Sequence, residues 1–155
     1  MNGQLVDILV INESKLNEMH DDSTFEHPCF ENYRLDRQNS GGGGVMVYVK
    51  KNLNPSRVVF DDASEIISFI ITIEKQQIGF LACYRPPYTA NESNFFNSLN
   101  NQLNNFEDLE TSEIFIVGDL NFNMDDHKHS SKLSQILDFQ IRFINLQGET
   151  RSRVK

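Results

Sequence analysis

Residues 114–123 constrain the fold of this chain more than any other part of its sequence. They read Ile-Phe-Ile-Val-Gly-Asp-Leu-Asn-Phe-Asn, so four apolar residues lead into a glycine, an acid and spaced amides. A short apolar run of this kind predicts a buried strand. In α/β folds, ligands collect at the carboxyl ends of strands, which makes Asp119 and Asn121 candidates for a functional site. Two residues apart on an extended chain, their side chains should project to the same side. The same residue types are also common in ordinary turns, and both interpretations stay open on this segment alone.

The rest of the chain predicts further strands and two helices. Strands are expected at residues 5–11, 33–36, 45–49, 66–73, 78–84 and 144–146, and helices at 92–107, with Asn91 as N-cap, and 131–139. The short connection 74–77 predicts a hairpin. Prolines 86 and 87 should end its second strand, because proline cannot continue a ladder. Paired strands and strands that alternate with helices occur together, which favours a mixed sheet or a two-sheet α/β sandwich.

Size, charge and cysteine content narrow the class of protein. The 155 residues suit a single domain with a real apolar core, and we treat residues 1–155 as one domain. The net charge of −8 argues against a protein that coats nucleic acid, since such proteins bind phosphates with lysine and arginine. It does not exclude an enzyme that touches nucleic acid locally through a divalent cation, which would reverse the local field.

The sequence has no apolar run long enough to span a bilayer and no signal-peptide pattern at its start. We therefore expect neither secretion nor membrane insertion. Cys29 and Cys83 have no metal-binding spacing and form no disulfide framework, so reduced thiols and an intracellular protein are expected.

Two other strand ends carry candidate residues. Glu13 follows the first predicted strand and is a plausible ligand for a hard metal such as Mg²⁺, although an ordinary loop acid is the simpler interpretation. Tyr84 and Arg85 end the strand at 78–84. The Tyr84 phenol can donate to an oxyanion and the Arg85 guanidinium can grip a phosphate, but a half-buried tyrosine beside a solvated arginine explains them equally well.

Other motifs carry weaker signals. The four glycines at residues 41–44 precede a strand, whereas phosphate-cradling loops precede a helix, so a flexible turn is the favoured interpretation. The alternate histidines His127 and His129 lack a nearby third ligand and make a poor zinc site. The sequence contains no serine elbow and no Cys–His arrangement, which disfavours covalent catalysis by serine or cysteine.

Taken in order, residues 10–16, 84–87 and 116–123 resemble the endonuclease/exonuclease/phosphatase superfamily. Within it, they are most similar to the apurinic-type endonuclease domain of LINE-type non-LTR retrotransposons. The first segment resembles the family motif Glu-Thr-x-Leu, with Ser14 in place of threonine. The last segment resembles Gly-Asp-Phe-Asn, with Leu120 in place of phenylalanine. The likeness extends from about Val6 to Arg151.

The resemblance implies a four-layer α/β sandwich of two mixed sheets flanked by helices. It also implies phosphodiester hydrolysis that depends on Mg²⁺ or Mn²⁺, with DNA as the substrate of the parent protein. Glu13 would bind the metal and Tyr84 would stabilise phosphate charge. Asp119 would orient or deprotonate the attacking water, and Asn121 would bind the scissile phosphate. Arg85 and Asn123 would add further phosphate or DNA contacts.

Two family segments have no counterpart in these 155 residues. One is an earlier strand that carries an active-site asparagine, and the other is a later Ser-Asp-His segment. We therefore expect a partial, truncated domain that nicks DNA weakly or not at all, and whether it is an active enzyme is left open. A non-catalytic remnant or binding module, and a phosphatase of the same fold, are the alternatives. A reverse transcriptase domain is expected in the parent protein, and a nuclear location if the substrate is chromosomal DNA.

Overall fold

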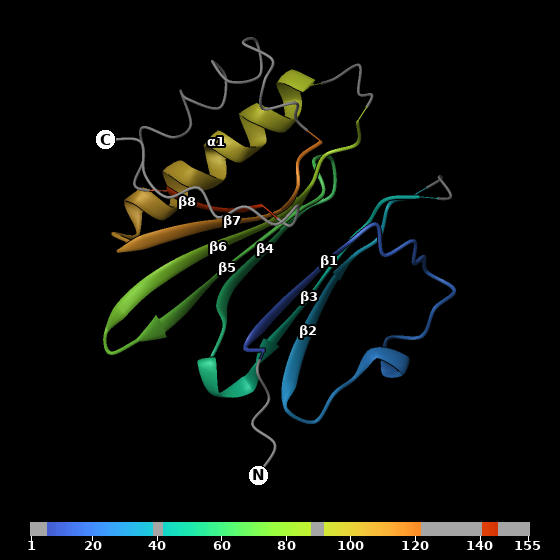
Figure 1. Ribbon diagram of the computed structural model, residues 1–155, viewed down its shortest axis with the longest axis horizontal. Coiled ribbons are helices and arrows are strands. Elements are labelled where there is room, and N and C mark those ends of the chain that lie inside the picture. The colour runs from blue at the N-terminus through green and yellow to red at the C-terminus, as the bar shows by residue number, and fades with distance from the viewer. Residues whose placement is uncertain (1–5, 39–41, 88–91, 122–140, 146–155) are drawn as a thin grey trace.

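The computed structural model describes residues 6–38, 42–87, 92–121 and 141–145 (Figure 1). Its strands form two sheets. The smaller sheet has the order β1 (Ile8–Asn12), β3 (Val45–Lys50) and β2 (Phe30–Leu35). The larger sheet has the order β4 (Ser56–Asp61), β5 (Ile66–Ile73), β6 (Gln76–Tyr84), β7 (Glu113–Asp119) and β8 (Ile141–Asn145). One α-helix, α1 (Glu92–Asp108), and two short 3₁₀ turns, Asp22–Phe25 and Lys51–Leu53, complete the described elements.

The two sheets pack face to face, and α1 covers the other face of the larger sheet (Figure 1). This confirms the predicted α/β fold with two packed sheets. The larger sheet is mixed, because β4, β5 and β6 are antiparallel whereas β6, β7 and β8 are parallel. The smaller sheet is antiparallel throughout its described strands, so the expectation of two mixed sheets was wrong for this one. A parallel pair needs a long crossover connection, and the segment that contains α1 provides it between β6 and β7.

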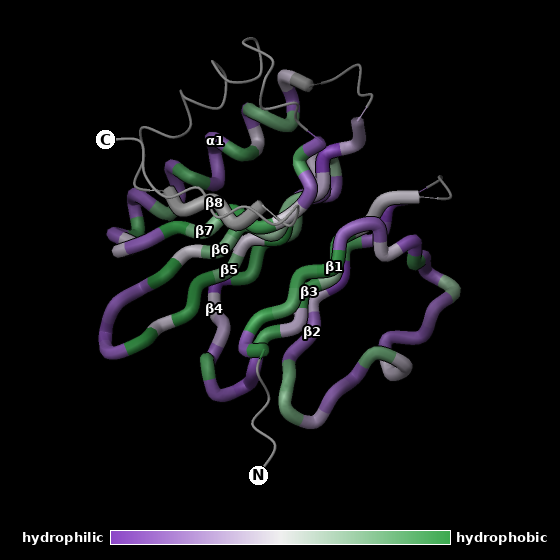
Figure 2. Tube along the Cα trace, viewed as in Figure 1, coloured by the Kyte–Doolittle hydropathy of each residue, from purple (hydrophilic) through white to green (hydrophobic). Residues whose placement is uncertain are grey.

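Strand β5 is buried on both faces and belongs to two separate hydrophobic clusters. Ile66 and Ile70 pack in the cluster beneath α1. Ile67, Phe69 and Ile71 alternate with them and pack between the two sheets. The predominance of apolar residues along this strand, visible as green in Figure 2, is the pattern expected when neither face meets water. Full burial of each such side chain contributes roughly 1.5–3 kcal/mol.

The helix α1 closes the outer cluster with a single apolar stripe. Phe95, Leu99, Leu103 and Phe106 lie three or four residues apart and are all buried against the sheet. Gly79 of β6 makes room for the Phe106 ring, because a Cβ atom at Gly79 would stand 2.9 Å from it. The expected helix is therefore confirmed, and its asparagines occupy the opposite face.

The observed elements differ from the predicted ones mainly at sheet edges. Strand β4 was not predicted, because only its third and sixth residues are even partly buried and its apolar residues do not alternate. Strand β2 begins at Phe30 rather than residue 33, since its pairing with β3 starts there. Strand β1 extends to Asn12, and β8 begins before the predicted residue 144. The predicted features that lie outside the described residues are the Asn91 cap, the helix at 131–139, Asn123, His127 and His129.

No helix in the described ranges combines the length and the apolarity needed to cross a bilayer.

Candidate active site

Tyr84 and Asp119 are the last residues of the neighbouring parallel strands β6 and β7. They are partners in the strand register, so their side chains project to the same face of the larger sheet. Tyr84 belongs to the cluster between the sheets, and this face is therefore the one that meets the smaller sheet. Two candidate residues thus stand side by side at the carboxyl edge of the sheet, where α/β folds place their ligands.

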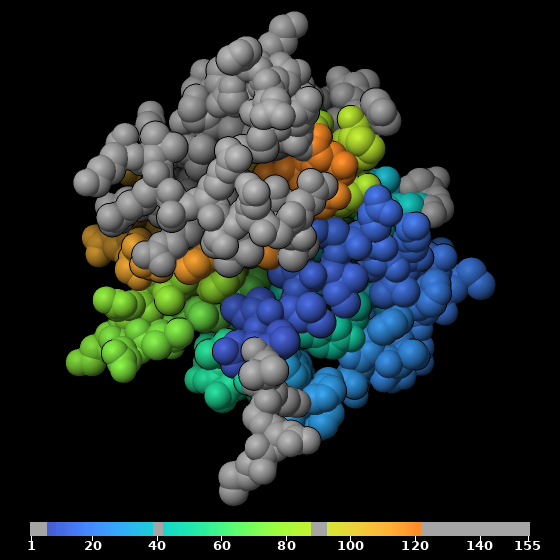
Figure 3. Space-filling model, viewed as in Figure 1, coloured from blue at the N-terminus to red at the C-terminus, as the bar shows by residue number. Residues whose placement is uncertain are grey.

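Glu13 reaches this edge from the smaller sheet. It follows the last residue of β1, and in the space-filling view the blue surface of the N-terminal part of the chain borders the orange surface of β7 (Figure 3). The Tyr84 hydroxyl group donates a 2.6 Å hydrogen bond to Glu13 Oε1. On its outer side, Glu13 Oε2 lies 3.6 Å from the Lys15 ammonium, with both side chains largely exposed. The carboxylate therefore has one oxygen fixed by the phenol and the other open to water.

The protonation states of this pair are complementary. The hydrogen bond from Tyr84 is the main cause that holds the pKa of Glu13 below its ordinary value. Burial, followed by the hydrogen bond to Glu13, raises the pKa of Tyr84 to about 12. At neutral pH the pair is thus an ionised carboxylate and a neutral phenol, which is the combination that a charge-assisted O–H···O⁻ hydrogen bond requires.

Asn121 is held against Asp119 by a local turn. Strand β7 ends at Asp119, and Asn121 adopts a left-handed conformation with φ of 47°. The Asn121 main-chain N–H donates to Asp119 Oδ1 at 2.9 Å. The expectation that an extended chain would carry both side chains to the same side was therefore wrong: the chain turns, and the acid caps the turn.

Arg85 fixes this turn from within. It is 4% exposed, and its guanidinium donates to the carbonyl oxygens of Leu120 and Asn121, each at 2.7 Å. In return, Asn121 Nδ2 donates to the Arg85 carbonyl oxygen at 2.8 Å. These three hydrogen bonds tie Arg85 to the turn, and a direct phosphate contact by Arg85 stays a prediction.

Gly118 allows β7 to approach β6 just before Asp119. It has φ of +148°, and a Cβ atom there would stand 1.8 Å from the Cys83 carbonyl oxygen. No other residue type fits this position without moving the strand. The Gly-Asp pair of the sequence is thus explained by crowding at the glycine, which sets the position of the acid that follows.

A second layer of residues lies behind Glu13 and Tyr84, and the sequence analysis missed it. The Arg37 guanidinium stands over the Tyr84 ring, 5.5 Å from its centroid, and forms an ion pair with Glu65. Glu65 also accepts the Gly44 N–H at 2.7 Å. Arg37 and Glu65 are 28 residues apart and belong to no recognisable motif, so the sequence carries no signal that pairs them.

The donor set around Glu13 fits a magnesium ion better than a zinc ion. No group of three or more His, Cys, Asp or Glu side chains gathers in the part of the chain that the structure describes, as a zinc site would require. Mg²⁺ instead uses one or two carboxylates together with waters and phosphate oxygens. Next to Glu13, both polar atoms of the Asn12 carboxamide are buried without a hydrogen-bond partner among the described residues. Buried polar atoms of this kind call for a partner, which a hydrated ion can supply.

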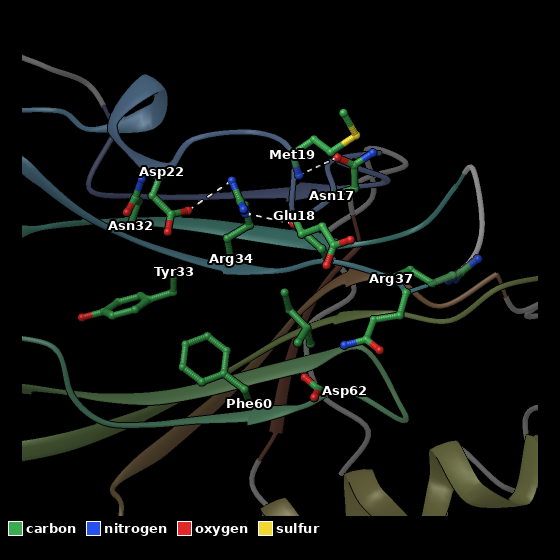
Figure 4. A pocket seen from close by; sticks show the side chains of 13 residues that line it. Asn17, Glu18, Met19, Asp22, Asn32, Tyr33, Arg34, Arg37, Phe60 and Asp62 are labelled. Carbon is green, nitrogen blue, oxygen red and sulfur yellow. Dashed lines mark hydrogen bonds and ion pairs between the residues drawn. The ribbon is translucent and has the colours of Figure 1, made fainter.

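A pocket of about 740 Å³ lies apart from these residues, between β2, the loop that precedes it and the end of β4 (Figure 4). Its wall includes Tyr33, Arg34, Phe60 and Asp62. None of Glu13, Tyr84, Asp119 or Asn121 lines this pocket. Arg37 does line it, and the Arg37 guanidinium also stands over the Tyr84 ring. The candidate site is therefore the group of polar residues at the strand ends, and not this pocket.

Comparison with solved structures shows similarity to the endonuclease domain of TRAS1, a telomere-specific non-LTR retrotransposon. The TM-score is 0.54 at 14% sequence identity, and the match covers 85% of this chain and 57% of that one. Truncated TDP2 of Caenorhabditis elegans matches with a TM-score of 0.49 at 14% identity, covering 76% of this chain and 50% of that one. The human Nocturnin catalytic domain with bound sulfate gives 0.48 at 12% identity, covering 80% and 54%. This chain thus spans between 50% and 57% of the length of the structures that it resembles.

A sequence profile described as the Endonuclease/Exonuclease/phosphatase family matches residues 3–152, whereas no curated protein gives a significant match. The resemblance seen in the three sequence segments is confirmed by this match and by the fold. Members of this family generally depend on a divalent metal ion. With nearly its entire length matched by the family profile, this chain belongs to the endonuclease/exonuclease/phosphatase family.

Proposed function

We propose that this chain carries the phosphodiester-hydrolysing site of a DNA-nicking endonuclease of the retroelement type. One observation carries the proposal: Glu13, Tyr84 and Asp119 come from the ends of three different strands and lie at one sheet edge. The hydrogen bond from Tyr84 to Glu13 joins the two sheets, and the strand register sets Asp119 beside Tyr84. Ion-pair networks with no catalytic role also bring charged residues together, but they do not require a strand-end acid, a phenol and a capped amide at the same edge.

Asp119 has the geometry of a group that orients or deprotonates an attacking water. Its Oδ1 accepts the Asn121 N–H, which fixes the orientation of the carboxylate. A fixed carboxylate can hold a water molecule and take up its proton as the water attacks phosphorus. Asn121 lies on the same turn, and we assign it a contact with the scissile phosphate.

Tyr84 offers a single proton that stays on the phenol at neutral pH. The phenol donates this proton to Glu13 in the structure. We propose that a phosphate oxygen replaces Glu13 as the acceptor when Glu13 acts as a metal ligand. A positioned donor of this kind stabilises negative charge that develops on the phosphate in the transition state.

Glu13 would hold the divalent metal ion, with Asn12 beside it as a candidate partner for a metal-bound water. When bound, Mg²⁺ or Mn²⁺ would neutralise charge on the phosphate and on the leaving oxygen. The net charge of −8 gives such an ion a further role, because the chain as a whole repels a polyanionic substrate.

DNA as substrate and a retroelement as source are supported by the segment order of the sequence and by the fold shared with the TRAS1 endonuclease domain. We infer further that the parent protein carries a reverse transcriptase domain. Phosphate or DNA contacts by Arg85 and Asn123 belong to the same proposal, and Asn123 lies outside the described residues.

A plasmid-nicking assay tests the proposal. Supercoiled DNA is incubated with the purified chain in excess, with Mg²⁺ or Mn²⁺, and the nicked circles are measured over time. We expect slow, metal-dependent nicking that falls at least ~100-fold in Asp119→Ala, as expected for loss of a general base. Asp108→Ala, at the exposed end of α1, is the matched control and should nick at the parental rate.

Two results would overturn the proposal. One is nicking of equal rate in the parent chain and in Asp119→Ala, which would place the activity elsewhere. The other is the absence of metal-dependent nicking at every protein concentration tested, which would favour a binding module of the same fold.

A further inference from the structure

Glu65 is a buried acid with more partners than a structural ion pair needs. Its side chain is 9% exposed, and its residue adopts a left-handed conformation with φ of 49° just before β5. One carboxylate oxygen accepts the Arg37 Nε–H at 2.5 Å, and the other accepts the Gly44 N–H at 2.7 Å. Replacement of such a pair by apolar residues is often neutral or stabilising, so stability alone is a weak reason for its presence.

The first set of contacts made by Glu65 holds Tyr84 in place. The Glu65 carbonyl oxygen accepts the Tyr84 N–H at 3.1 Å, which fixes the main chain at the end of β6. The Glu65 carboxylate holds the Arg37 guanidinium, and that group stands over the Tyr84 ring at 5.5 Å from its centroid. A cation over the face of an aromatic ring is attracted by it, so the ring is held from one side as well as through its backbone.

The second set of contacts made by Glu65 holds the segment that carries Glu13. Gly44 donates its N–H to Glu65, while its carbonyl oxygen accepts the Ser14 N–H at 3.3 Å. The Gly43 carbonyl oxygen accepts the Lys15 N–H at 3.0 Å. The two residues after Glu13 are therefore tied to a glycine turn that Glu65 itself anchors.

The glycines are required for this arrangement. Gly43 and Gly44 have φ of +80° and +88°, and a Cβ atom on Gly43 would stand 2.3 Å from the Arg37 guanidinium carbon. A side chain there would displace Arg37 from the Tyr84 ring. Gly43 and Gly44 thus allow the approach of Arg37 and the hydrogen bonds to residues 14 and 15.

We propose that Glu65 and Arg37 are positioning residues that hold both ends of the Tyr84–Glu13 hydrogen bond. Glu65 reaches Tyr84 through Arg37 and reaches the Glu13 segment through Gly44. Neither residue needs to touch the substrate. This inference rests on the proposed function only where it speaks of catalysis, since the arrangement of Tyr84 and Glu13 can be measured without turnover.

The chain offers a closely matched control in Arg34, a residue of β2 that lies three positions before Arg37. Arg34 also forms an ion pair with a carboxylate, Asp36, at 3.1 Å, and its guanidinium also stands 5.5 Å from a ring centroid, that of Phe25. None of its described contacts reaches Glu13 or Tyr84. The variants Arg34→Gln and Asp36→Asn therefore remove the same kinds of interaction outside the candidate site.

The experiment compares Arg37→Gln and Glu65→Gln with these controls in the full 155-residue chain. The first readout is the ¹³C NMR shift of the Tyr84 ring and of the Glu13 carboxyl group without metal or DNA. The second is the split between kcat and KM for plasmid nicking, at a temperature where circular dichroism shows every variant folded. Glu65→Gln keeps an oxygen that can accept the Gly44 N–H, so it tests the charge with the least disturbance of the fold.

We expect both NMR signals to move in Arg37→Gln and Glu65→Gln and to stay in place in the controls. We expect kcat to fall ~10-fold or more with KM within about twofold, because misplacement of reacting groups lowers turnover more than binding. Unchanged NMR signals in the two site variants, or equal changes in the controls, would overturn the proposal. If the parent chain does not nick DNA, the proposed function fails, and the NMR readout still decides the positioning role.

Discussion

The Tyr84 hydroxyl group donates a 2.6 Å hydrogen bond to Glu13 Oε1 across 71 positions of sequence. Glu13 follows a strand of the smaller sheet, whereas Tyr84 ends a strand of the larger one. Any shift of one sheet against the other would therefore change the length of this bond. The geometry of the candidate site depends in this way on the packing between the sheets as well as on local turns.

Replacement of Tyr84 by phenylalanine should raise the pKa of Glu13 toward its ordinary value. The phenol hydrogen bond is the main cause that lowers this pKa, and the variant removes it. A lowered carboxyl pKa stabilises the fold above the ordinary value and loses that contribution as the pH falls, so Tyr84→Phe should also flatten the acid side of the stability profile. A ¹³C NMR titration of Glu13 measures the shift directly. Tyr33→Phe is the control, since the Tyr33 hydroxyl group donates to Glu31 at the same distance of 2.6 Å.

Arg85→Gln should destabilise the protein by ~2 kcal/mol, because it leaves the partly buried carbonyl oxygens of Leu120 and Asn121 without their charged donor. An arginine that served only to bind phosphate would leave the free energy of unfolding unchanged. Urea denaturation distinguishes these cases, with Arg57→Gln on the exposed face of β4 as control. Equal stability of Arg85→Gln and the parent chain would remove the turn-fixing role.

Gly118→Ala should cost ~3 kcal/mol or more, because the new Cβ atom would overlap the Cys83 carbonyl oxygen and the backbone of β6 cannot yield cheaply. Gly42→Ala is the matched control, since a Cβ atom at Gly42 meets nothing within 4 Å. Denaturation curves of the two variants give the comparison. A small cost for Gly118→Ala would mean that β7 can move away from β6, and that the position of Asp119 is less fixed than the structure indicates.

The two cysteines should react at very different rates with a thiol reagent. Cys29 is exposed, whereas Cys83 is fully buried and its pKa is raised by that burial. Since the thiolate is the reactive form, iodoacetamide should modify Cys29 in the native protein and Cys83 only after unfolding. Mass spectrometry of the labelled peptides gives the two rates. Rapid native labelling of Cys83 would indicate that the cluster beneath α1 opens easily.

The elements that the sequence predicted well are those whose burial repeats a simple pattern. The limits of β5 were predicted at residues 66 and 73, because six of its eight residues are apolar and a short polar turn follows it. The helix was predicted nearly to its last residue, because its apolar stripe has a period that only a helix explains. Strand β4 was missed since an edge strand needs few buried side chains to pair.

The candidate site was predictable only in part for a similar reason. Glu13, Tyr84 and Asp119 each follow or end an apolar strand, and that local signal is readable in the sequence. The pair of Arg37 and Glu65 has no such signal, because its members meet through tertiary packing alone. The conformation at Asn121 was predicted wrongly, because an asparagine in a sequence does not show whether its backbone is extended or left-handed. In the structure it is left-handed.

The hairpin of β5 and β6 contributes side chains to both hydrophobic clusters, which bears on the order in which the protein folds. Ile66 and Leu81 pack toward α1, while Phe69 and Tyr84 pack toward the smaller sheet. Neither cluster can close before the hairpin exists, and the hairpin is local in sequence, so we expect it to form early in folding. Native-state hydrogen exchange would then find the central amides of these strands among the last to exchange, after those of α1 and β1. Earlier exchange in the hairpin than in the helix would show that the two layers fold independently of it.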